Sequence, residues 1–164
     1  MKKLKIGVIG LGRLGYEHAC NIANRVCGAE LAAVCDMDGK RAKAVAEELG
    51  VTAVYTNPKE LCGDPGVEAV AMITDTSSHV EMTGYAMDAG KHVFCEKPLA
   101  ENLEKCQTAE KIAEAHPELT FMLGFMRRYD HSYQIAKRKI EDGEIGDIIL
   151  VRCYSQDPIA IIEG

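Results

Sequence analysis

Three glycines lie at the spacing that a backbone turn needs in order to hold a phosphate group. Gly10, Gly12 and Gly15 form the pattern G-x-G-x-x-G, directly after the apolar run 4–9 and at the start of a stretch with helical spacing. In such a turn the first glycine allows a tight bend, the second lets the backbone approach a pyrophosphate, and the third lets helix and strand pack closely. The start of the helix adds free amides and the positive end of a dipole.

An acidic residue completes this pattern. Asp36 ends the next apolar run, 30–36, about twenty residues beyond Gly15, which is where a dinucleotide-binding unit carries its acid. The glycines alone would also suit a plain strand-to-helix turn. Strand, turn, helix and acid together predict a bound dinucleotide.

The choice of dinucleotide depends on the charge at Asp36. A carboxylate there accepts hydrogen bonds from ribose hydroxyls and repels a 2′-phosphate, so we expect NAD rather than NADP. NADP remains the alternative cofactor, because three basic residues are near enough in sequence to contact its 2′-phosphate: Arg13, Lys40 and Arg41. Arg41 is almost equally well interpreted as a solvated helix residue. Leu14 and Met37, beside the turn and the acid, are further expected cofactor contacts.

A lysine could carry out the chemical step. Lys97 stands in the block Cys95-Glu96-Lys97-Pro98, which follows the apolar run 92–95. Ligands of open α/β sheets bind beyond the carboxyl ends of the strands. A lysine there can face a nicotinamide and a substrate hydroxyl, stabilise a developing alkoxide and take part in proton transfer. From spacing alone, an exposed loop lysine is the more economical interpretation.

Alternating strands and helices are expected to position these residues. The expected strands are 4–9, 30–36, 51–55, 69–73, 92–95 and 120–124. The expected helices are 13–26, 40–49, a short helix from Pro58, 78–89 and 103–115. Continuous apolar strands separated by helices predict an α/β fold with a parallel sheet covered on both faces, in the doubly wound (Rossmann) order 3-2-1-4-5-6. Gly50 and Gly90 are expected helix ends, and Ser78–Glu81 is an expected capping box.

A second unit is predicted from residue 126 onward, so that the domains span 1–125 and 126–164. It would begin a second α+β domain with a helix near 132–141 and a strand at 147–155. The strand is rich in apolar and β-branched residues, and a lone strand is not stable in water. We therefore expect a homo-oligomer in which 147–155 pairs with the same strand of a second copy. Folding back onto its own domain, or disorder, is the alternative.

Composition argues against several classes of protein. The 164 residues are 47% hydrophobic and 27% charged, which is ordinary for a globular protein with a core. The net charge of −6 argues against nucleic-acid binding, because a phosphate backbone attracts clustered Lys and Arg. The one basic run, 137–139, is expected to be a solvated helix face. No apolar run approaches the length of a membrane span, and the run behind the N-terminus is too short for a signal peptide.

The cysteines also indicate the cellular compartment in which the protein is expected. Seven are scattered along the chain without a C-x-x-C pair, several of them inside apolar runs. A free cysteine in such a run behaves as a small hydrophobe. We therefore expect reduced thiols, a cytoplasmic location and no structural metal.

The order of these motifs resembles that of the Gfo/Idh/MocA family, which comprises glucose-fructose oxidoreductases, inositol dehydrogenases and relatives. The resemblance rests on the glycine turn, the strand ending in Asp36, the segment 73–79 (I-T-D-T-S-S-H) and the highly specific block 89–100 (A-G-K-H-V-F-C-E-K-P-L-A). It covers the whole chain. The segments 124–130 and 151–155 look most like the inositol 2-dehydrogenase branch.

The resemblance implies an NAD-dependent oxidoreductase that moves hydride from a secondary alcohol of a polyol or sugar to nicotinamide. Lys97 matches the lysine of the family's E-K-P motif at the reaction centre, where Glu96 also meets the cofactor and the Lys97–Pro98 bond would be cis. Thr74 and His79 match the loop that passes the cofactor riboses. Met126 and Arg127 match residues beside the nicotinamide and the substrate, as Lys97 does.

Two departures from the family qualify this expectation. Asp75 stands where the family often has proline, which adds a charge near the cofactor. Family members also carry an Asp and a His, in a D-x-x-x-H arrangement of the second domain, that complete the proton relay, and we expect the chain to stop before them. His116 and His131 are interpreted as surface residues. The chain would then be inactive alone. The alternative to an enzyme is a non-catalytic dinucleotide-binding protein or partner subunit. An amino-acid biosynthetic reductase is a weaker alternative, because it would not be expected to carry the E-K-P block.

Overall fold

The computed structural model describes residues 2–156. Contacts within the chain divide it into two compact units, residues 1–125 and 126–164. The first contains a complete sheet with its covering helices, and the second contains one α-helix within the described residues.

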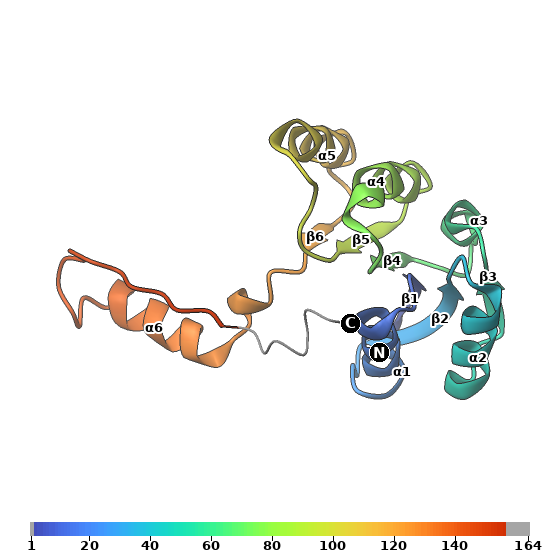
Figure 1. The fold of residues 1–164 in the computed structure, drawn as a ribbon, viewed down its shortest axis with the longest axis horizontal. Helices are drawn as coiled ribbons and strands as arrows, with labels where there is room; N and C mark the ends of the chain where they lie inside the picture. Colours follow the sequence, from blue (N-terminus) through green and yellow to red (C-terminus); the bar gives the residue numbers. More distant parts are fainter. Residues whose placement is uncertain (1, 157–164) are drawn as a thin grey trace. The chain divides into compact units, whose positions relative to one another are not determined.

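The first unit is built on one parallel sheet (Figure 1). Its strands are β1 (Leu4–Ile9), β2 (Ala29–Cys35), β3 (Ala53–Tyr55), β4 (Ala69–Met72), β5 (His92–Cys95) and β6 (Phe121–Leu123). They lie in the order β3-β2-β1-β4-β5-β6, and every neighbouring pair is parallel. The predicted doubly wound order is confirmed. Since β1 and β4 are neighbours, the switch point, where such sheets bind ligands, lies between them.

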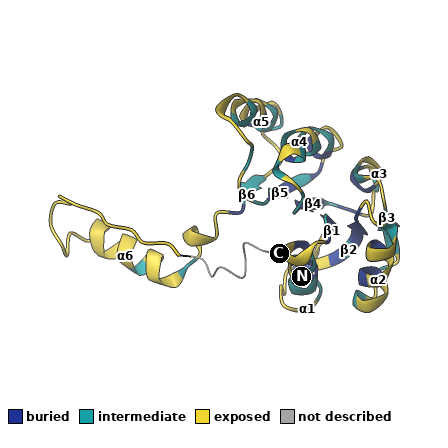
Figure 2. Cartoon of the chain, in the orientation of Figure 1, coloured by how far each residue is buried: buried dark blue, intermediate teal, exposed yellow. Residues whose placement is uncertain are grey.

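Helices cover both faces of this sheet (Figure 1). They are α1 (Arg13–Asn24), α2 (Gly39–Leu49), α3 (Pro58–Gly63), α4 (His79–Asp88) and α5 (Leu103–Ala115). Successive strand residues point to opposite faces. Val8 therefore packs with residues of α1 and α2, whereas Ile9 packs with residues of α3 and α4. Figure 2 shows the buried residues gathered on the strands and on the helix faces turned toward them.

Most elements begin and end within two residues of their predicted bounds. The expected helix end at Gly50 is confirmed. At its other end α2 is capped by Asp38, whose carboxylate accepts hydrogen bonds from the amides of Lys40 and Arg41 at 2.9 and 3.3 Å. This cap fixes the start of α2 directly after the loop that carries Asp36.

The predicted capping box at Ser78 is wrong. Thr76–Ser78 form a short 3₁₀ helix, η1, that leads into α4, and Ser78 has helical rather than extended backbone angles. A capping side chain needs the extended conformation to reach back to the free amides of the helix. The Ser78 hydroxyl instead donates to the carbonyl oxygen of Asp75 at 2.7 Å, and Glu81 hydrogen-bonds the Tyr85 hydroxyl.

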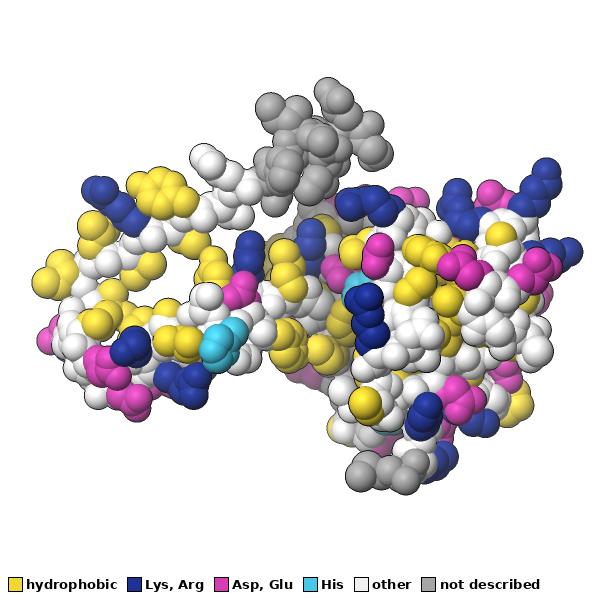
Figure 3. All heavy atoms as spheres, turned by 90° about the horizontal axis from the view of Figure 1, so that it is seen from below, with side chains coloured by type: hydrophobic (Ala, Val, Ile, Leu, Met, Phe, Trp, Pro, Cys, Tyr) yellow, Lys and Arg dark blue, Asp and Glu magenta, His cyan; other side chains and the backbone are white. Residues whose placement is uncertain are grey.

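The second unit contains η2 (Met126–Arg128) and α6 (His131–Glu141). Asp130 caps α6 by accepting hydrogen bonds from the amides of Ser132 and Tyr133 at 3.0 and 3.4 Å. The basic run 137–139 is exposed on this helix, as predicted. Figure 3 shows Lys and Arg side chains lying among Asp and Glu on the face that it draws.

The predicted strand at 147–155 does not form in this structure. The chain from 147 to 156 is irregular and exposed, and Ile149 is 96% exposed. A strand needs a neighbour to satisfy its backbone groups, and 147–156 pairs with no strand in the described part of the chain. Residues 157–164 lie outside the described residues. No helix between residues 2 and 156 is long and apolar enough to cross a membrane.

Candidate functional site

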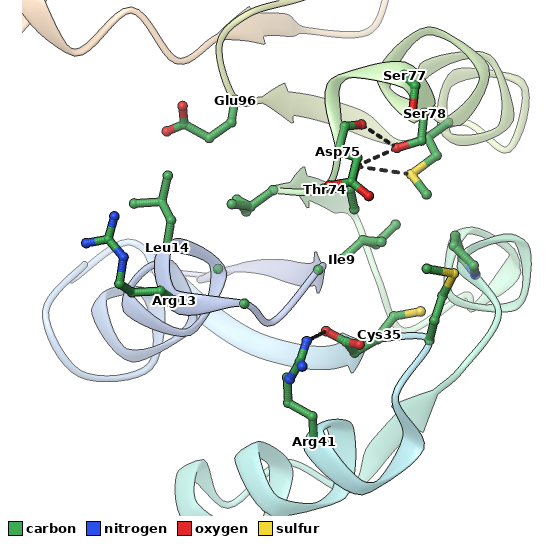
Figure 4. A pocket seen from close by; sticks show the side chains of 18 of the residues that line it. Ile9, Arg13, Leu14, Cys35, Arg41, Thr74, Asp75, Ser77, Ser78 and Glu96 are labelled. Atoms are coloured by element: carbon green, nitrogen blue, oxygen red, sulfur yellow. Dashed lines mark hydrogen bonds and ion pairs between the residues drawn. The ribbon is translucent and has the colours of Figure 1, made fainter. Parts of the chain in front are cut away.

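A pocket of about 630 Å³ opens beyond the carboxyl ends of β1, β2, β4 and β5 (Figure 4). This volume is in the range of small-molecule and cofactor sites. Its lining includes most of the residues predicted to bind a cofactor, namely Gly10, Gly12, Arg13, Leu14, Gly15, Asp36, Met37, Arg41, Thr74, Glu96 and Lys97. The other lining residues are Ile9, Cys35, Pro58, Ile73, Asp75, Ser77, Ser78 and Met82. Sequence reasoning missed these except Asp75, because neither their residue types nor their spacing had indicated a cofactor site.

The glycine turn has two different steric requirements. A Cβ atom on Gly15 would lie 1.8 Å from the carbonyl oxygen of Gly10, and one on Gly10 would lie 2.3 Å from the carbonyl oxygen of Ile73. These two glycines are therefore required by the protein itself. A Cβ atom on Gly12 would meet no protein atom within 4 Å. Gly12 instead leaves its backbone open on the pocket side, which fits the close approach of a pyrophosphate.

The start of α1 adds the features of an anion site. Gly12 is the N-cap of this helix, no side chain caps it, and its first turn carries no acidic residue. The first amides of the helix are then free to bind an anion at the positive end of the helix dipole. Figure 4 shows Arg13 and Leu14 at this end of the pocket.

Asp36 lies just beyond β2 and is 9% exposed. One oxygen accepts hydrogen bonds from the amide of Leu11 at 2.8 Å and from the Arg41 guanidinium at 3.3 Å. The other accepts from the amide of Asp38 at 2.8 Å. A carboxylate offers about four lone-pair sites, so capacity remains for a ribose hydroxyl. Asp36 thus also holds the glycine turn in place, a contact that the sequence did not reveal.

A second polar loop follows β4. The hydroxyls of Thr74 and Ser78 are 2.8 Å apart, and Ser78 in turn donates to the carbonyl oxygen of Asp75. These bonds fix the Thr74 hydroxyl on the pocket wall (Figure 4). Asp75 is exposed beside it and adds the charge that its departure from the family predicts.

His79 lies behind this wall and is not among the lining residues. The residue is 1% exposed, and its ring has Nδ1 at 2.9 Å from the carbonyl oxygen of Pro98 and Nε2 at 3.1 Å from that of Thr74. The ring therefore joins the loops that follow β4 and β5. Asp75 and His79 have the spacing D-x-x-x-H, but the buried ring faces carbonyl oxygens rather than the pocket.

Glu96 and Lys97 lie at the end of β5, and the Lys97–Pro98 bond is cis, as predicted. Lys97 is exposed at the pocket. The Glu96 carboxylate accepts a hydrogen bond from the Lys97 amide at 2.9 Å, and its other oxygen lies 3.1 Å from Nε2 of His18. His18 was missed. The sequence feature that could have indicated it is its position three residues after Gly15, which places both residues on one face of α1.

Two buried thiols lie at the ends of the strands that lead to the pocket. Burial raises the pKa of Cys35 and of Cys95 to about 12, and the neighbouring acids Asp36 and Glu96 act in the same direction. Both thiols are therefore almost fully protonated at neutral pH, which makes them poor nucleophiles. No group of three or more His, Cys, Asp or Glu among the described residues could hold a metal ion.

Met126 and Arg127 belong to the second unit, where both are exposed in η2. Arg127 pairs with Asp130 at 3.1 Å.

A comparison with family models decides the family. The model described as "Oxidoreductase family, NAD-binding Rossmann fold", GFO_IDH_MocA, matches residues 4–125. The chain belongs to this family. The predicted family, its Rossmann fold and NAD as its cofactor are confirmed.

Comparisons with individual proteins support the same family. The chain is 43% identical to scyllo-inositol 2-dehydrogenase (NAD(+)) of Bacillus subtilis over 94% of its length and 45% of the relative's. It is 37% identical to inositol 2-dehydrogenase of Salmonella typhimurium over 90% of its length and 44% of the relative's. The crystal structure of scyllo-inositol dehydrogenase from Lactobacillus casei, with bound NAD(H) and scyllo-inositol, superposes with a TM-score of 0.86 at 38% identity, covering 89% of this chain and 43% of that one. The chain thus spans less than half the length of these relatives.

Proposed function

We propose that this chain is the cofactor-binding part of an NAD-dependent dehydrogenase of cyclic polyols, similar in activity to the inositol 2-dehydrogenases. The observation that carries the proposal is that Lys97 lines the same pocket as the glycine turn and Asp36. One pocket thus joins residues suited to a dinucleotide with a residue suited to proton chemistry. The polyol class is supported by relatives named for inositol substrates.

Different residues of the chain would bind different parts of the dinucleotide. The glycine turn, 10–15, with Arg13 would hold the pyrophosphate, since it combines an open backbone with free amides. Asp36 would accept hydrogen bonds from the adenosine ribose, with Met37 and Arg41 beside it. Thr74 and Glu96 would contact the opposite half of the cofactor.

Lys97 would act at the reaction centre. When bound, NAD supplies the nicotinamide ring that accepts hydride from the alcohol carbon. The Lys97 ammonium can donate a hydrogen bond to the reacting hydroxyl, stabilise the negative charge that develops on its oxygen and take part in moving its proton. The family's second domain would supply the Asp and His of the relay, and Met126 and Arg127 would contribute to substrate binding.

We propose that the 164-residue chain binds NAD but does not oxidise polyols by itself. The proton relay of the family requires groups from its second domain, and general acid–base catalysis is typically worth about 10²–10⁴-fold in rate. Calorimetric titration with NAD and NADP, followed by an assay of NADH formation with scyllo- and myo-inositol, tests both statements. We expect binding with a preference for NAD and no turnover. A preference for NADP would contradict the role of Asp36, and robust NADH formation would contradict the assignment of the relay.

We also propose that the segment 147–155 mediates self-association. Ile149, Leu150, Val151 and Tyr154 are all more than 70% exposed, and their backbone could form a ladder with a second copy. Light scattering after size exclusion, on the full chain and on a version that ends at Phe125, provides the test. A monomer in both cases at micromolar concentration would contradict the proposal.

The compartment proposed for the protein is the cytoplasm. Its seven cysteines are unpaired, and Cys35, Cys62 and Cys95 are buried among apolar side chains. Such thiols stay reduced where glutathione and thioredoxin act. Fractionation of the source cells, followed by immunodetection of the chain, tests this location.

A further inference from the structure

The Glu96 carboxylate is held by two donors from different elements. One oxygen accepts a hydrogen bond from the amide of Lys97, the next residue, at 2.9 Å. The other oxygen lies 3.1 Å from Nε2 of His18 on α1. Because a carboxylate only accepts, the ring nitrogen carries the hydrogen and donates it. The two side chains are 13% and 27% exposed, so water competes only weakly for these bonds.

The space around Glu96 is shaped to keep it there. Gly124, directly after β6, has no side chain, and a Cβ atom at this position would lie 3.2 Å from the Glu96 carboxylate and 3.0 Å from the Phe94 ring. The Phe94 ring also lies against the His18 ring, with centroids 5.5 Å apart. His18 and Gly124 thus lie beside the carboxylate, and the Phe94 ring lies beside both of them.

This arrangement links the two ends of the pocket. His18 belongs to α1, whose N-terminus forms the phosphate-binding turn, and Glu96 adjoins Lys97 at the end of β5. Among the described residues the Glu96 carboxylate pairs with His18, and the Lys97 ammonium makes no ion pair within 4 Å. Without His18, an oxygen of Glu96 would lose its partner and would be free to pair with the ammonium of Lys97, the next residue in the chain.

We propose that His18 is a positioning residue for the nicotinamide end of the pocket: it holds the Glu96 carboxylate on the Lys97 amide and away from the Lys97 ammonium. The role of this pocket end rests on the proposed function. The consequence is that Lys97 keeps a free ammonium for the substrate hydroxyl while its backbone stays fixed to the pocket wall.

Two measurements on the 164-residue chain test this proposal. The first is the NMR signal of the Lys97 amide, which reports the hydrogen bond to Glu96 whether or not a cofactor is bound. The second is the affinity for NAD compared with that for ADP-ribose, which lacks the nicotinamide ring. The variants are His18→Ala, His18→Gln, which keeps a donor near the position of Nε2, and His116→Ala, which alters a histidine paired with Asp88 on the surface.

In His18→Ala we expect the Lys97 amide signal to move toward that of an unbonded amide. NAD affinity should fall about 2- to 10-fold, the equivalent of one hydrogen bond, while ADP-ribose affinity stays the same. His18→Gln should restore both readouts, and His116→Ala should change neither. An unchanged Lys97 amide in a folded His18→Ala chain would overturn the proposal, as would an equal loss for NAD and ADP-ribose. Absence of NAD binding by the unaltered chain would overturn the proposed function instead, and the amide signal would still decide the role of His18.

Discussion

Nδ1 of His79 lies 2.9 Å from the carbonyl oxygen of Pro98, and the opposite ring nitrogen lies 3.1 Å from that of Thr74. One buried ring therefore connects the loop beyond β4 to the loop that carries Lys97. A carbonyl oxygen only accepts, so whichever ring nitrogen carries a hydrogen finds an acceptor. The side chain that the family resemblance assigned to the cofactor thus fixes the spacing of two walls of the pocket.

Replacing His79 should therefore affect stability and binding together. His79→Ala leaves buried carbonyl groups without a partner, and we expect a loss of about 1–3 kcal/mol in the free energy of unfolding. NAD affinity should fall as well because Thr74 loses its support. Urea unfolding and calorimetric titration measure the two effects. His131→Ala, at an exposed position of α6, is the control and should stay within about 0.5 kcal/mol; a His79 variant as stable as this control would refute the structural role.

The glycine turn offers a matched pair of substitutions that separates folding from binding. Gly15→Ala places a Cβ atom 1.8 Å from the carbonyl oxygen of Gly10, and we expect it to destabilise the first unit by about 1–3 kcal/mol or more. Gly12→Ala meets no protein atom within 4 Å, so stability should be kept. Its methyl group would instead meet the pyrophosphate, and NAD affinity should fall by about tenfold or more, equivalent to about 1.4 kcal/mol. Thermal unfolding and calorimetry distinguish the two variants, and a Gly12→Ala chain that binds NAD normally would move the pyrophosphate away from this turn.

Asp36 and Arg41 should influence the choice of cofactor in opposite directions. Asp36→Asn keeps an acceptor for a neighbouring amide but removes the charge that repels a 2′-phosphate, so the ratio of NAD to NADP affinity should fall about tenfold. Arg41→Ala removes a cation that is 49% exposed and close to the same carboxylate. That change frees an acceptor for the ribose and removes a contact for a 2′-phosphate, so the ratio should rise. Titrations of both variants with both cofactors provide the test, and shifts in the same direction would contradict the assignment.

The sequence predicted those parts of the site whose chemistry is local. Gly10, Gly15 and Asp36 could be assigned because a strand, a turn and a helix occupy consecutive residues, and their spacing alone defines the geometry. The bond between His18 and Glu96 could not, because 78 residues separate the two partners. Only the order of the strands brings α1 beside the end of β5.

Side-chain burial, strand pairing and local backbone geometry explain the remaining differences between the sequence-based predictions and the structure. His79 has the position of a cofactor residue in the family pattern, but the sequence did not show that its ring points inward against two carbonyl groups. The segment 147–155 has the composition of a strand, yet composition cannot supply the neighbour that a strand requires. Ser78 failed as a cap because η1 precedes α4 and turns its backbone helical.

The buried cysteines yield a prediction of pH dependence. Burial raises the pKa of Cys95 from 9.0 to about 12, whereas Cys27 and Cys153 are exposed. Since only a thiolate reacts, an aromatic disulfide reagent at pH 8 should label the two exposed thiols first. From the thiolate fractions alone, Cys95 should be labelled on the order of 10³-fold more slowly in the folded chain than in the unfolded chain. Mass spectrometry of labelled peptides over time identifies the sites, and rapid labelling of Cys95 in the folded chain would contradict its burial.

The same shift in pKa predicts a loss of stability in alkali. Because the folded-state pKa of Cys95 is above its unfolded value, its contribution is fully present below about pH 9 and is lost as the pH rises toward 12. Other groups titrate in this range, so the informative quantity is the difference in free energy of unfolding between the unaltered chain and Cys95→Ala. Urea unfolding at pH 8 and at pH 11 should show this difference shrinking, because the alanine variant has no thiol to ionise. A difference that stays constant would mean that Cys95 ionises as readily in the folded chain as in the unfolded one, and the thiol would then be open to solvent at the end of β5.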